Sequence, residues 1–413
     1  MSSVRVPSVR ALACAAASAA LLAGCSLAGS DAATPAATPT TGPASASPST
    51  SDPTPSSSAP STPASTTSAA TPAVTDSATP DPTDDPAVTS ATLVFTGEVL
   101  MHQSLIDTAL HNAGGRNFDF RPMFDGIKNL LTAADLAVCH LELPVIPDGE
   151  GMEPRYAAPP QVMDALAYAG FDRCSTASNH ALDRGVKGSN ATLVAFERVG
   201  MTQHGTARKA SEAAPTVLDV GGIKVTHLSY TEVRGLPEPG DQPWRLSDAS
   251  MDKILADVAA ARKLGAEWIA VSIHDSDELH YQPTPNQKSW DHWLSDVAKV
   301  DLVVGTGSHV PEPVGERDGR FVLYGLGNLI NWRLDARDSV IARVRIEKQA
   351  DGSIRTLTPE LIPTFTEESR GYEVLDARTF HAKGLDQRTQ ADLKAAFRRV
   401  DPYVDAWIPK LGF

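Results

Sequence analysis

An alternation of short apolar runs with helix-like segments constrains the fold of this chain more than any other feature. Five β-rich runs are predicted strands, at 92–97, 135–139, 172–177, 267–273 and 301–306. Among them, apolar residues recur every three or four positions, which predicts helices over 122–134, 160–170, 186–200, 251–265 and 285–300. Strands that alternate with helices in this way indicate an α/β fold.

Turn signals add antiparallel strands to this pattern. Hairpins are predicted around Gly221-Gly222 and Asp318-Gly319, and a third over 342–362. They indicate a mixed sheet or a second sheet. A metal-dependent (β/α) barrel is the alternative fold, but a barrel of parallel strands has little use for hairpins. From Leu375 onward the pattern predicts amphipathic helix.

The first ninety residues have a different composition and are expected to lie outside the folded domain. Two arginines, a short apolar stretch and Leu-Ala-Gly-Cys predict a lipoprotein signal over 1–25 with Cys25 acylated; an ordinary cleaved secretion signal is the alternative. Residues 26–90 are rich in Ser, Thr, Pro and Ala and contain no aromatic residue, Lys or Arg, so they predict a disordered linker. The protein is therefore expected outside the cytoplasm, anchored by lipid to the outer face of the membrane.

Charge and cysteine content limit the partners and the covalent cross-links that the remaining 323 residues can have. Without Arg5, Arg10 and six aspartates of the N-terminal part, 34 basic and 44 acidic residues remain, a net charge of −10. Nucleic-acid binding is not expected, because phosphate backbones recruit clusters of Lys and Arg. Cys139 and Cys174 end apolar runs that could be neighbouring strands, so a disulfide and two buried thiols both stay open.

Each predicted strand ends at residues that can bind a metal ion or move a proton. In an open α/β sheet such ends face one crevice, where ligands bind. Neutral imidazole suits zinc, iron or manganese, and carboxylate and amide oxygens suit manganese, magnesium or calcium. The candidates are Glu98, His102, His140, Glu142, Asn179, His180, Asp183, His274, Asp275, Asp277, Glu278, His280 and His309.

Structural roles are the alternative for each of these residues taken singly. Asn179 could shape a turn, and Asp183 could cap the following helix. Five strand ends that all carry such residues are better explained by one shared cleft.

The motifs as an ordered set resemble the CapA family of bacterial capsule and poly-γ-glutamate synthesis proteins. They are VFTGEVLMH, VCHLELP, STASNHALDRG, HGTA, SIHDSDELHYQPTPNQ, DLVVGTGSHVPEPV and LYGLGN, between Thr92 and Trp332. The resemblance implies a metallophosphatase-like α/β/β/α sandwich with two mixed sheets, over 91–366, followed by a helical extension over 367–413. It also implies an extracytoplasmic protein that serves an anionic envelope polymer or its synthase.

The resemblance also implies site residues. Glu98, Asn179, His180, His274 and His309 are expected to bind a divalent metal (manganese, zinc or iron), and Asp183 and Glu278 to orient a histidine during catalysis. His140, Glu142 and Asn328 are expected elsewhere in the cleft. Three motifs that carry the expected ligands are altered from the family pattern: Glu98 replaces Asp, Gly307 replaces the first His of Gly-x-His-x-His, and Asp275-Ser276 replaces Trp-Gly. His140 also stands where the family has Asn, beside the retained Glu142.

Two functions are consistent with this residue set. One is a metal-dependent hydrolase or transferase that attacks an amide or phosphoester. The other is a catalytically degenerate lipoprotein that binds the polymer or anchors its synthase, which the three departures favour because metal geometry tolerates little error.

Overall fold

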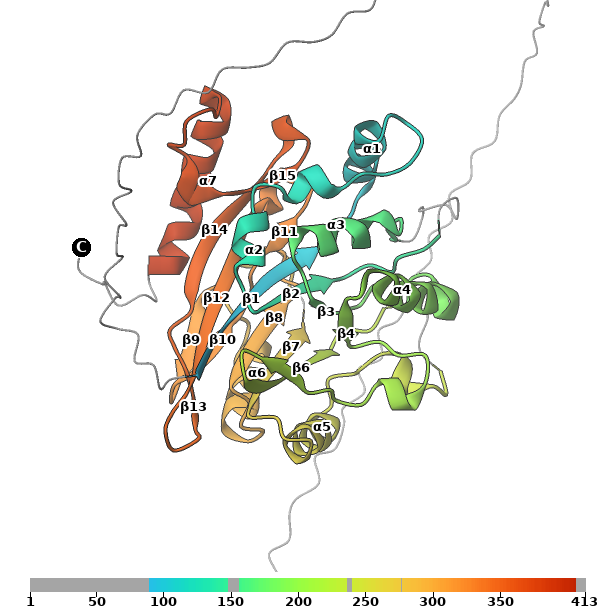
Figure 1. Cartoon of the computed structure of the whole chain (residues 1–413), viewed down its shortest axis with the longest axis vertical. Coiled ribbons are helices and arrows are strands. Elements are labelled where there is room, and N and C mark those ends of the chain that lie inside the picture. Colours follow the sequence, from blue (N-terminus) through green and yellow to red (C-terminus); the bar gives the residue numbers. More distant parts are fainter. Residues whose placement is uncertain (1–88, 148–155, 236–239, 276, 406–413) are drawn as a thin grey trace, which may run out of the picture. The chain divides into compact units, whose positions relative to one another are not determined.

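The computed structural model describes residues 89–147, 156–235, 240–275 and 277–405. Cys25, the predicted signal segment and the predicted linker up to residue 88 lie outside these ranges. The described part folds into two β-sheets with helices on their outer faces (Figure 1). Within these ranges, no helix combines the length and apolarity needed to cross a membrane.

The first sheet carries most of the predicted strand ends. Its described strands run in the order β15-β14-β12-β1-β2-β3-β4, with β11 paired to β1 and β13 paired to β12. Strands β1 to β4 are parallel, whereas β12, β14 and β15 are antiparallel neighbours. Their bounds are β1 Thr89–Val99, β2 Leu136–Leu141, β3 Arg173–Ser175, β4 Thr202–His204, β11 Asn328–Ile330, β12 Asp338–Lys348, β13 Ile354–Thr356, β14 Glu360–Glu367 and β15 Glu373–Asp376.

The second sheet has the order β5-β6-β7-β8-β10-β9. Its four central strands are parallel, and the edge strands β5 and β9 join it through tight hairpins. Both hairpins turn at the predicted Gly-Gly and Asp-Gly pairs, and the third predicted hairpin is β12–β13. The bounds are β5 Leu218–Val220, β6 Ile223–Thr231, β7 Trp268–His274, β8 Leu302–Thr306, β9 Val314–Arg317 and β10 Arg320–Leu323.

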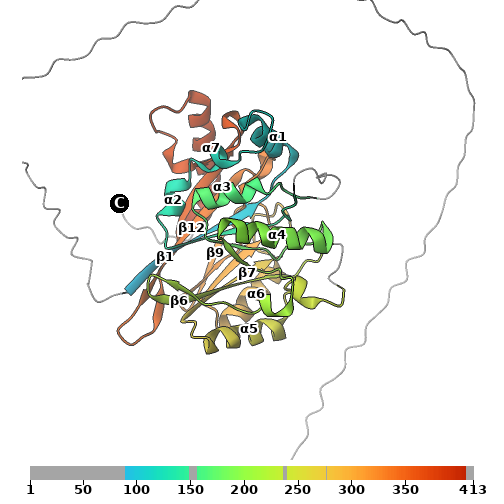
Figure 2. The same ribbon diagram turned by 45° about the vertical axis from the view of Figure 1, so that its right-hand side comes forward.

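The helices cover the two outer faces, and Figure 2 shows α2, α3 and α4 on one side of the strands and α5 and α6 on the other. Side-chain alternation along β1 explains the layers, because successive residues of a strand face opposite sides. Leu93 and Phe95 pack between the sheets with Trp268, whereas Val94 packs under the outer helices with Phe124. Helix bounds are α1 Gln103–Asn112, α2 Lys128–Thr132, α3 Gln161–Ala169, α4 Gly185–Val199, α5 Met251–Lys263, α6 Pro285–Asp296 and α7 Gln387–Asp405.

The α/β class with two mixed sheets is confirmed, and the barrel alternative is wrong. The helix predicted over 122–134 is wrong in extent: the chain forms a 3-10 turn at Arg121–Phe124 and then the short α2. Gly126 separates them, and a Cβ there would lie 2.5 Å from the carbonyl oxygen of Val374, so this point packs directly on β15.

The C-terminal part also differs from the expected continuous helix. Leu375 lies in β15, which adds a strand to the first sheet beyond residue 366. Helix α7 begins at Gln387, where the Asp386 carboxylate accepts hydrogen bonds from the backbone N–H groups of Arg388 and Thr389. The helix then packs on β14.

The open question about the cysteines has an answer in the structure. Cys139 and Cys174 are direct partners in the β2–β3 pair, and a disulfide joins them. Both are buried. The disulfide cross-links two strands at positions directly before His140 and Ser175.

Candidate functional site at the strand ends

Sheet pairing brings the predicted residues of the first sheet together. Glu98 on β1 lies between His140 on β2 and Asn328 on β11 as their register partner. His140 in turn lies opposite Ser175 on β3, and its Nδ1 atom is 2.8 Å from the Ser175 hydroxyl. Glu98, His140 and Asn328 are all buried.

The second sheet meets this group at His274, the last residue of β7. Its Nε2 atom lies 3.0 Å from the Asn179 side-chain oxygen, and its Nδ1 atom 3.2 Å from the Thr306 hydroxyl on β8. The His274 ring also stacks on the His140 ring, with centroids 5.2 Å apart. Residues from strands of both sheets therefore meet at one place.

His309 closes the group from the loop after β8. It has a left-handed backbone with φ 60°, and its Nδ1 atom lies 2.9 Å from the Asn328 side-chain oxygen. Asn328 also donates to the His309 carbonyl at 3.3 Å, so it fixes both the ring and the backbone. The His309 Nε2 atom points to Glu142, 3.9 Å from its carboxylate.

We call these residues the strand-end cluster: Glu98, His140, Glu142, Asn179, His180, His274, His309 and Asn328. Side chains of this cluster line a cavity of about 150 Å³ together with Tyr156, Trp332 and Arg333. The cavity reaches Glu142, His180 and His309, so these three are the members that a ligand meets first.

His180 and Asp183 lie together at this cavity. Asp183 is 2.9 Å from the His180 Nδ1 atom, and the ring of Tyr156 meets the imidazole edge-on at 4.7 Å. The alternative that Asp183 caps α4 is wrong, because the N-cap residue is Arg184. The contact between the Asp183 carboxylate and the imidazole orients His180.

Other candidates lie at the edge of the cluster or away from it. Glu278 and His102 line the cavity, and His102 stacks on Trp332 with centroids 4.4 Å apart. His280 instead forms an exposed ion pair with Asp277. Asp275 accepts a hydrogen bond from Asn286 at 2.8 Å. His280 is therefore not part of the cluster.

Gly307 stands where the family pattern has a histidine, and here the main chain, not a side chain, makes the contact with the cluster. Its φ of 104° is a conformation that favours glycine, and its backbone N–H donates to the Glu98 carboxylate. The loop after β8 thus contacts Glu98 through its main chain.

Burial dominates the electrostatics of the cluster. It raises the pKa of Glu98 to about 7 against the opposing effect of His309, and it raises the pKa of Glu142 as well. It lowers the pKa of His140 to about 3 and that of His274 well below its ordinary value. Burial also disfavours charge on His309, but the Glu142 and Glu98 carboxylates outweigh it and raise the His309 pKa.

The fit of a metal ion rests on three buried atoms without a hydrogen-bond partner. They are Glu98 Oε2, Glu142 Oε2 and His140 Nε2. Buried polar atoms of this kind are rare and call for a donor, water or ion, so the donor chemistry fits a divalent cation. Among the described residues, however, no three His, Cys, Asp or Glu side chains are already grouped to hold one. The five-residue ligand set stays a prediction.

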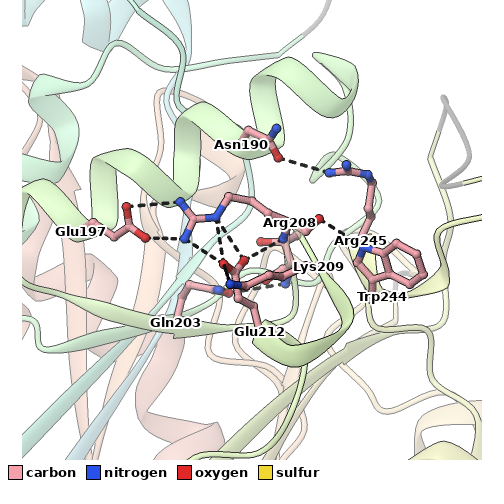
Figure 3. Close-up of polar contacts among 9 residues, drawn as sticks. Asn190, Glu197, Gln203, Arg208, Lys209, Glu212, Trp244 and Arg245 are labelled. Carbon is pink, nitrogen blue, oxygen red and sulfur yellow. Dashed lines mark hydrogen bonds and ion pairs between the residues drawn. The ribbon is translucent and has the colours of Figure 1, made fainter.

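The loop with Asn179 and His180 is followed directly by α4, and polar contacts hold α4 against two later segments of the chain. Arg208 lies between Glu197 on α4 and Glu212, and it forms ion pairs with both (Figure 3). The Trp244 indole donates to the Arg208 carbonyl at 3.3 Å, and Arg245 donates to Asn190 on α4 at 3.2 Å. These contacts join α4 to residues 205–212 and 243–245.

Several contributors carried no signal in the sequence. Ser175 and Thr306 hold histidines of the cluster, and Tyr156 and Trp332 line the cavity, but each looks like an ordinary strand or loop residue. Ser175 lies in a predicted strand and Thr306 ends one, so register with His140 and His274 could have indicated them.

The fold and cluster define a layered α/β protein with a polar site at its strand ends. The family model for the bacterial capsule synthesis protein PGA_cap matches residues 92–333, so the chain belongs to this family. This range contains every residue of the strand-end cluster.

Curated relatives agree with this assignment. The chain is 29% identical over 215 residues to a probable polyglutamine synthesis accessory protein of Mycobacterium tuberculosis, covering 48% of this chain and 56% of that protein. It is 25% identical over 251 residues to the capsule biosynthesis protein CapA of Bacillus anthracis, covering 58% and 59%. The chain thus spans just over half the length of these relatives. A calcineurin-like phosphoesterase structure from Bacillus subtilis aligns with a TM-score of 0.44 at 11% identity, covering 77% of this chain and 99% of that one.

Proposed function

We propose that this chain is an accessory protein in the synthesis of a poly-glutamate capsule or a related anionic envelope polymer. The observation that carries the proposal is the family match over 92–333, which includes all the residues that meet at the strand ends. The capsule and polyglutamine synthesis roles given to the Bacillus and mycobacterial relatives support it.

The proposed place of action is the outer face of the cell membrane. The Leu-Ala-Gly-Cys sequence ending at Cys25 and the linker over 26–90 support a lipid-anchored protein whose domain stands clear of the membrane. Its proposed partners there are the membrane, the polymer and the polymer synthase.

Deletion and complementation in the source organism test the proposed function. Cells without the chain should contain less extracellular anionic polymer per cell, and the full chain supplied in trans should restore it. Unchanged amount and chain length of every envelope polymer in the deletion strain would contradict the proposal.

A second candidate function is a metal-dependent hydrolase or transferase, and the three unpartnered buried atoms favour it. Glu98, Asn179, His180, His274 and His309 are the residues proposed to hold the ion. The chemistry that such an ion supplies when bound is activation of water near neutral pH. This chain's own residues orient the donors: Asp183 holds His180 and Asn328 holds His309.

Metal analysis separates this candidate from a catalytically degenerate binding protein. The purified full chain should retain manganese, zinc or iron after dialysis, and His180→Ala should retain less. If the parent holds no metal under any loading condition, the degenerate alternative gains support. In that case the double variant Glu98→Asp with Gly307→His should bind metal where the parent does not.

A further inference from the structure

We propose that Gly235 is a positioning residue of the strand-end cluster, because it fixes the backbone of Asn179 and thereby the Asn179–His274 hydrogen bond. It lies in the segment that follows β6, and no motif in the sequence pointed to it. The functional weight of this contact rests on the proposed function, whereas the contact itself does not.

The first observation is a backbone approach that leaves no room for a side chain. A Cβ atom on Gly235 would lie 1.7 Å from the carbonyl oxygen of Asn179 and 2.9 Å from its carbonyl carbon. Real Cβ contacts under 3.0 Å essentially do not occur, and these atoms are backbone that cannot swing aside. A side chain at position 235 must therefore move Asn179 or the segment itself.

The second observation is that the same segment also binds the partner of Asn179. The backbone N–H of Glu232 donates to the His274 carbonyl at 2.9 Å. Residues 232–235 thus contact both members of the pair whose side chains meet at 3.0 Å. Residues 232–235 therefore lie against both the Asn179 loop, which follows β3 of the first sheet, and the end of β7 in the second sheet.

The third observation is that the segment is anchored and cannot simply retreat. Thr231 donates from its backbone to Ser247 at 2.9 Å, and Ala249 donates back to Thr231 at 2.8 Å. Arg234 forms an ion pair with Asp248, and the Trp290 indole donates to the Glu232 carboxylate at 2.6 Å. Displacement is therefore expected to fall largely on Asn179.

A second glycine packs closely on the same stretch of chain, just before Asn179. A Cβ on Gly205 would lie 2.3 Å from the Ala177 nitrogen, two residues before Asn179. The loop after Gly205 is the one that Arg208 fastens to α4 (Figure 3). Because the residues just before Asn179 are also closely packed, a displacement at Gly235 is expected to reach the Asn179–His274 hydrogen bond.

The decisive readout is the imidazole spectrum of His274, since a merely structural glycine would not change it selectively. We would label the histidines of the full chain with 15N and assign His274 with a His274→Gln variant. Gly235→Ala should shift the His274 Nε2 resonance to the position that it takes in Asn179→Ala. Gly240→Asn is the matched control, because position 240 lies five residues further along the chain, Asn tolerates its left-handed backbone (φ 63°), and a Cβ there meets nothing within 4 Å.

A combined variant tests whether Gly235 acts through Asn179. In the Asn179→Ala background, Gly235→Ala should leave the His274 resonance where Asn179→Ala alone puts it. A folded Gly235→Ala protein with the parent His274 resonance would overturn the inference. If Gly235→Ala does not fold, Arg234→Ala decides, since it keeps the glycine but removes the ion pair to Asp248 that holds the adjacent residue. A shift toward the Asn179→Ala position supports the inference, and the parent position contradicts it.

Polymer production separates failure of this inference from failure of the proposed function. Gly235→Ala should lower polymer yield as Asn179→Ala does, with Gly240→Asn at the parent level. If Asn179→Ala lowers the yield and Gly235→Ala does not, the positioning role fails. If no variant changes the yield while the His274 resonance moves as expected, the proposed function fails and the contact stands.

Discussion

At the scale of single residues, the strand-end cluster is unusual because carboxylates and imidazoles share a buried space. Ion pairs in such places lose hydration, and burial disfavours the charged form of each group, although the Glu142 and Glu98 carboxylates outweigh this effect at His309. Glu98 illustrates this, since burial raises its pKa to about 7 from an ordinary value of 4.5. A group with this shift makes stability depend on pH.

The Glu98→Gln variant should remove that dependence. The folded protein keeps the Glu98 proton between about pH 4.5 and 7, whereas the unfolded chain loses it, so this group's contribution to stability falls as pH rises through this window. Relative to the parent, Glu98→Gln should gain up to about 3 kcal/mol above pH 7 and little below pH 4.5.

Urea unfolding at pH 4, 5.5 and 8, with a chelator present, measures this difference. The control is Glu316→Gln, which removes an exposed carboxylate. If the difference in the free energy of unfolding between Glu98→Gln and the parent does not change with pH, or grows toward acid pH, the folded protein does not hold the Glu98 proton.

The sequence predicted those site residues that come at or directly after the end of a strand. Glu98, His140 and His274 each lie at or next to the end of a strand, so the shared edge of the sheets could be expected. The partners of these groups were harder to foresee: Ser175 and Thr306 act through register, and Gly235 acts through a backbone approach from a distant segment. Periodicity in a sequence indicates which residues face a layer, but not which backbones touch.

At the scale of elements, β1, β2, β7 and β8 came close to their predicted ranges because apolar runs between turn signals specify buried strands. The predictions were wrong where tertiary contacts, not local sequence, determine whether a residue is in a helix or a strand. The close packing of Gly126 on β15 divides a predicted helix, and pairing with β14 makes Leu375 a strand residue.

The disulfide between β2 and β3 gives a prediction at this scale. Cys139 and Cys174 are 35 residues apart, and closing a loop of that length should stabilise the fold by about 4 kcal/mol. Replacing both cysteines with Ala should lower the free energy of unfolding by about this amount.

Denaturant unfolding of the parent and the double Ala variant measures the effect, with mass spectrometry confirming the oxidised state. The double Ser variant is a useful companion, since it adds buried hydroxyls to the same loss of the cross-link. Equal stability of the parent and the double Ala variant would mean that the cross-link does not constrain the chain.

At the scale of the whole molecule, the proposed function requires the described domain to be held where the polymer is made. The proposed anchor is Cys25, which lies outside the described residues. Cys25→Ser should move the chain from the membrane fraction to the medium or the soluble envelope fraction, because the acyl chains supply the membrane affinity.

Cys14→Ser is the matched control for this fractionation, since it changes the other N-terminal cysteine and should leave the chain in the membrane fraction. A Cys25→Ser protein that stays with the membrane would contradict lipid anchoring at this residue.

The most direct test of the account is whether the strand-end cluster is needed for polymer synthesis. Extracellular polymer would be measured in the deletion strain supplied with the parent chain, with His309→Ala, or with His292→Ala, which changes an exposed histidine paired to Asp296 on α6. At equal protein levels, His309→Ala should lower polymer roughly tenfold or more, and His292→Ala should match the parent. Parent-level polymer from a folded His309→Ala protein would contradict the claim that this cluster is the functional site.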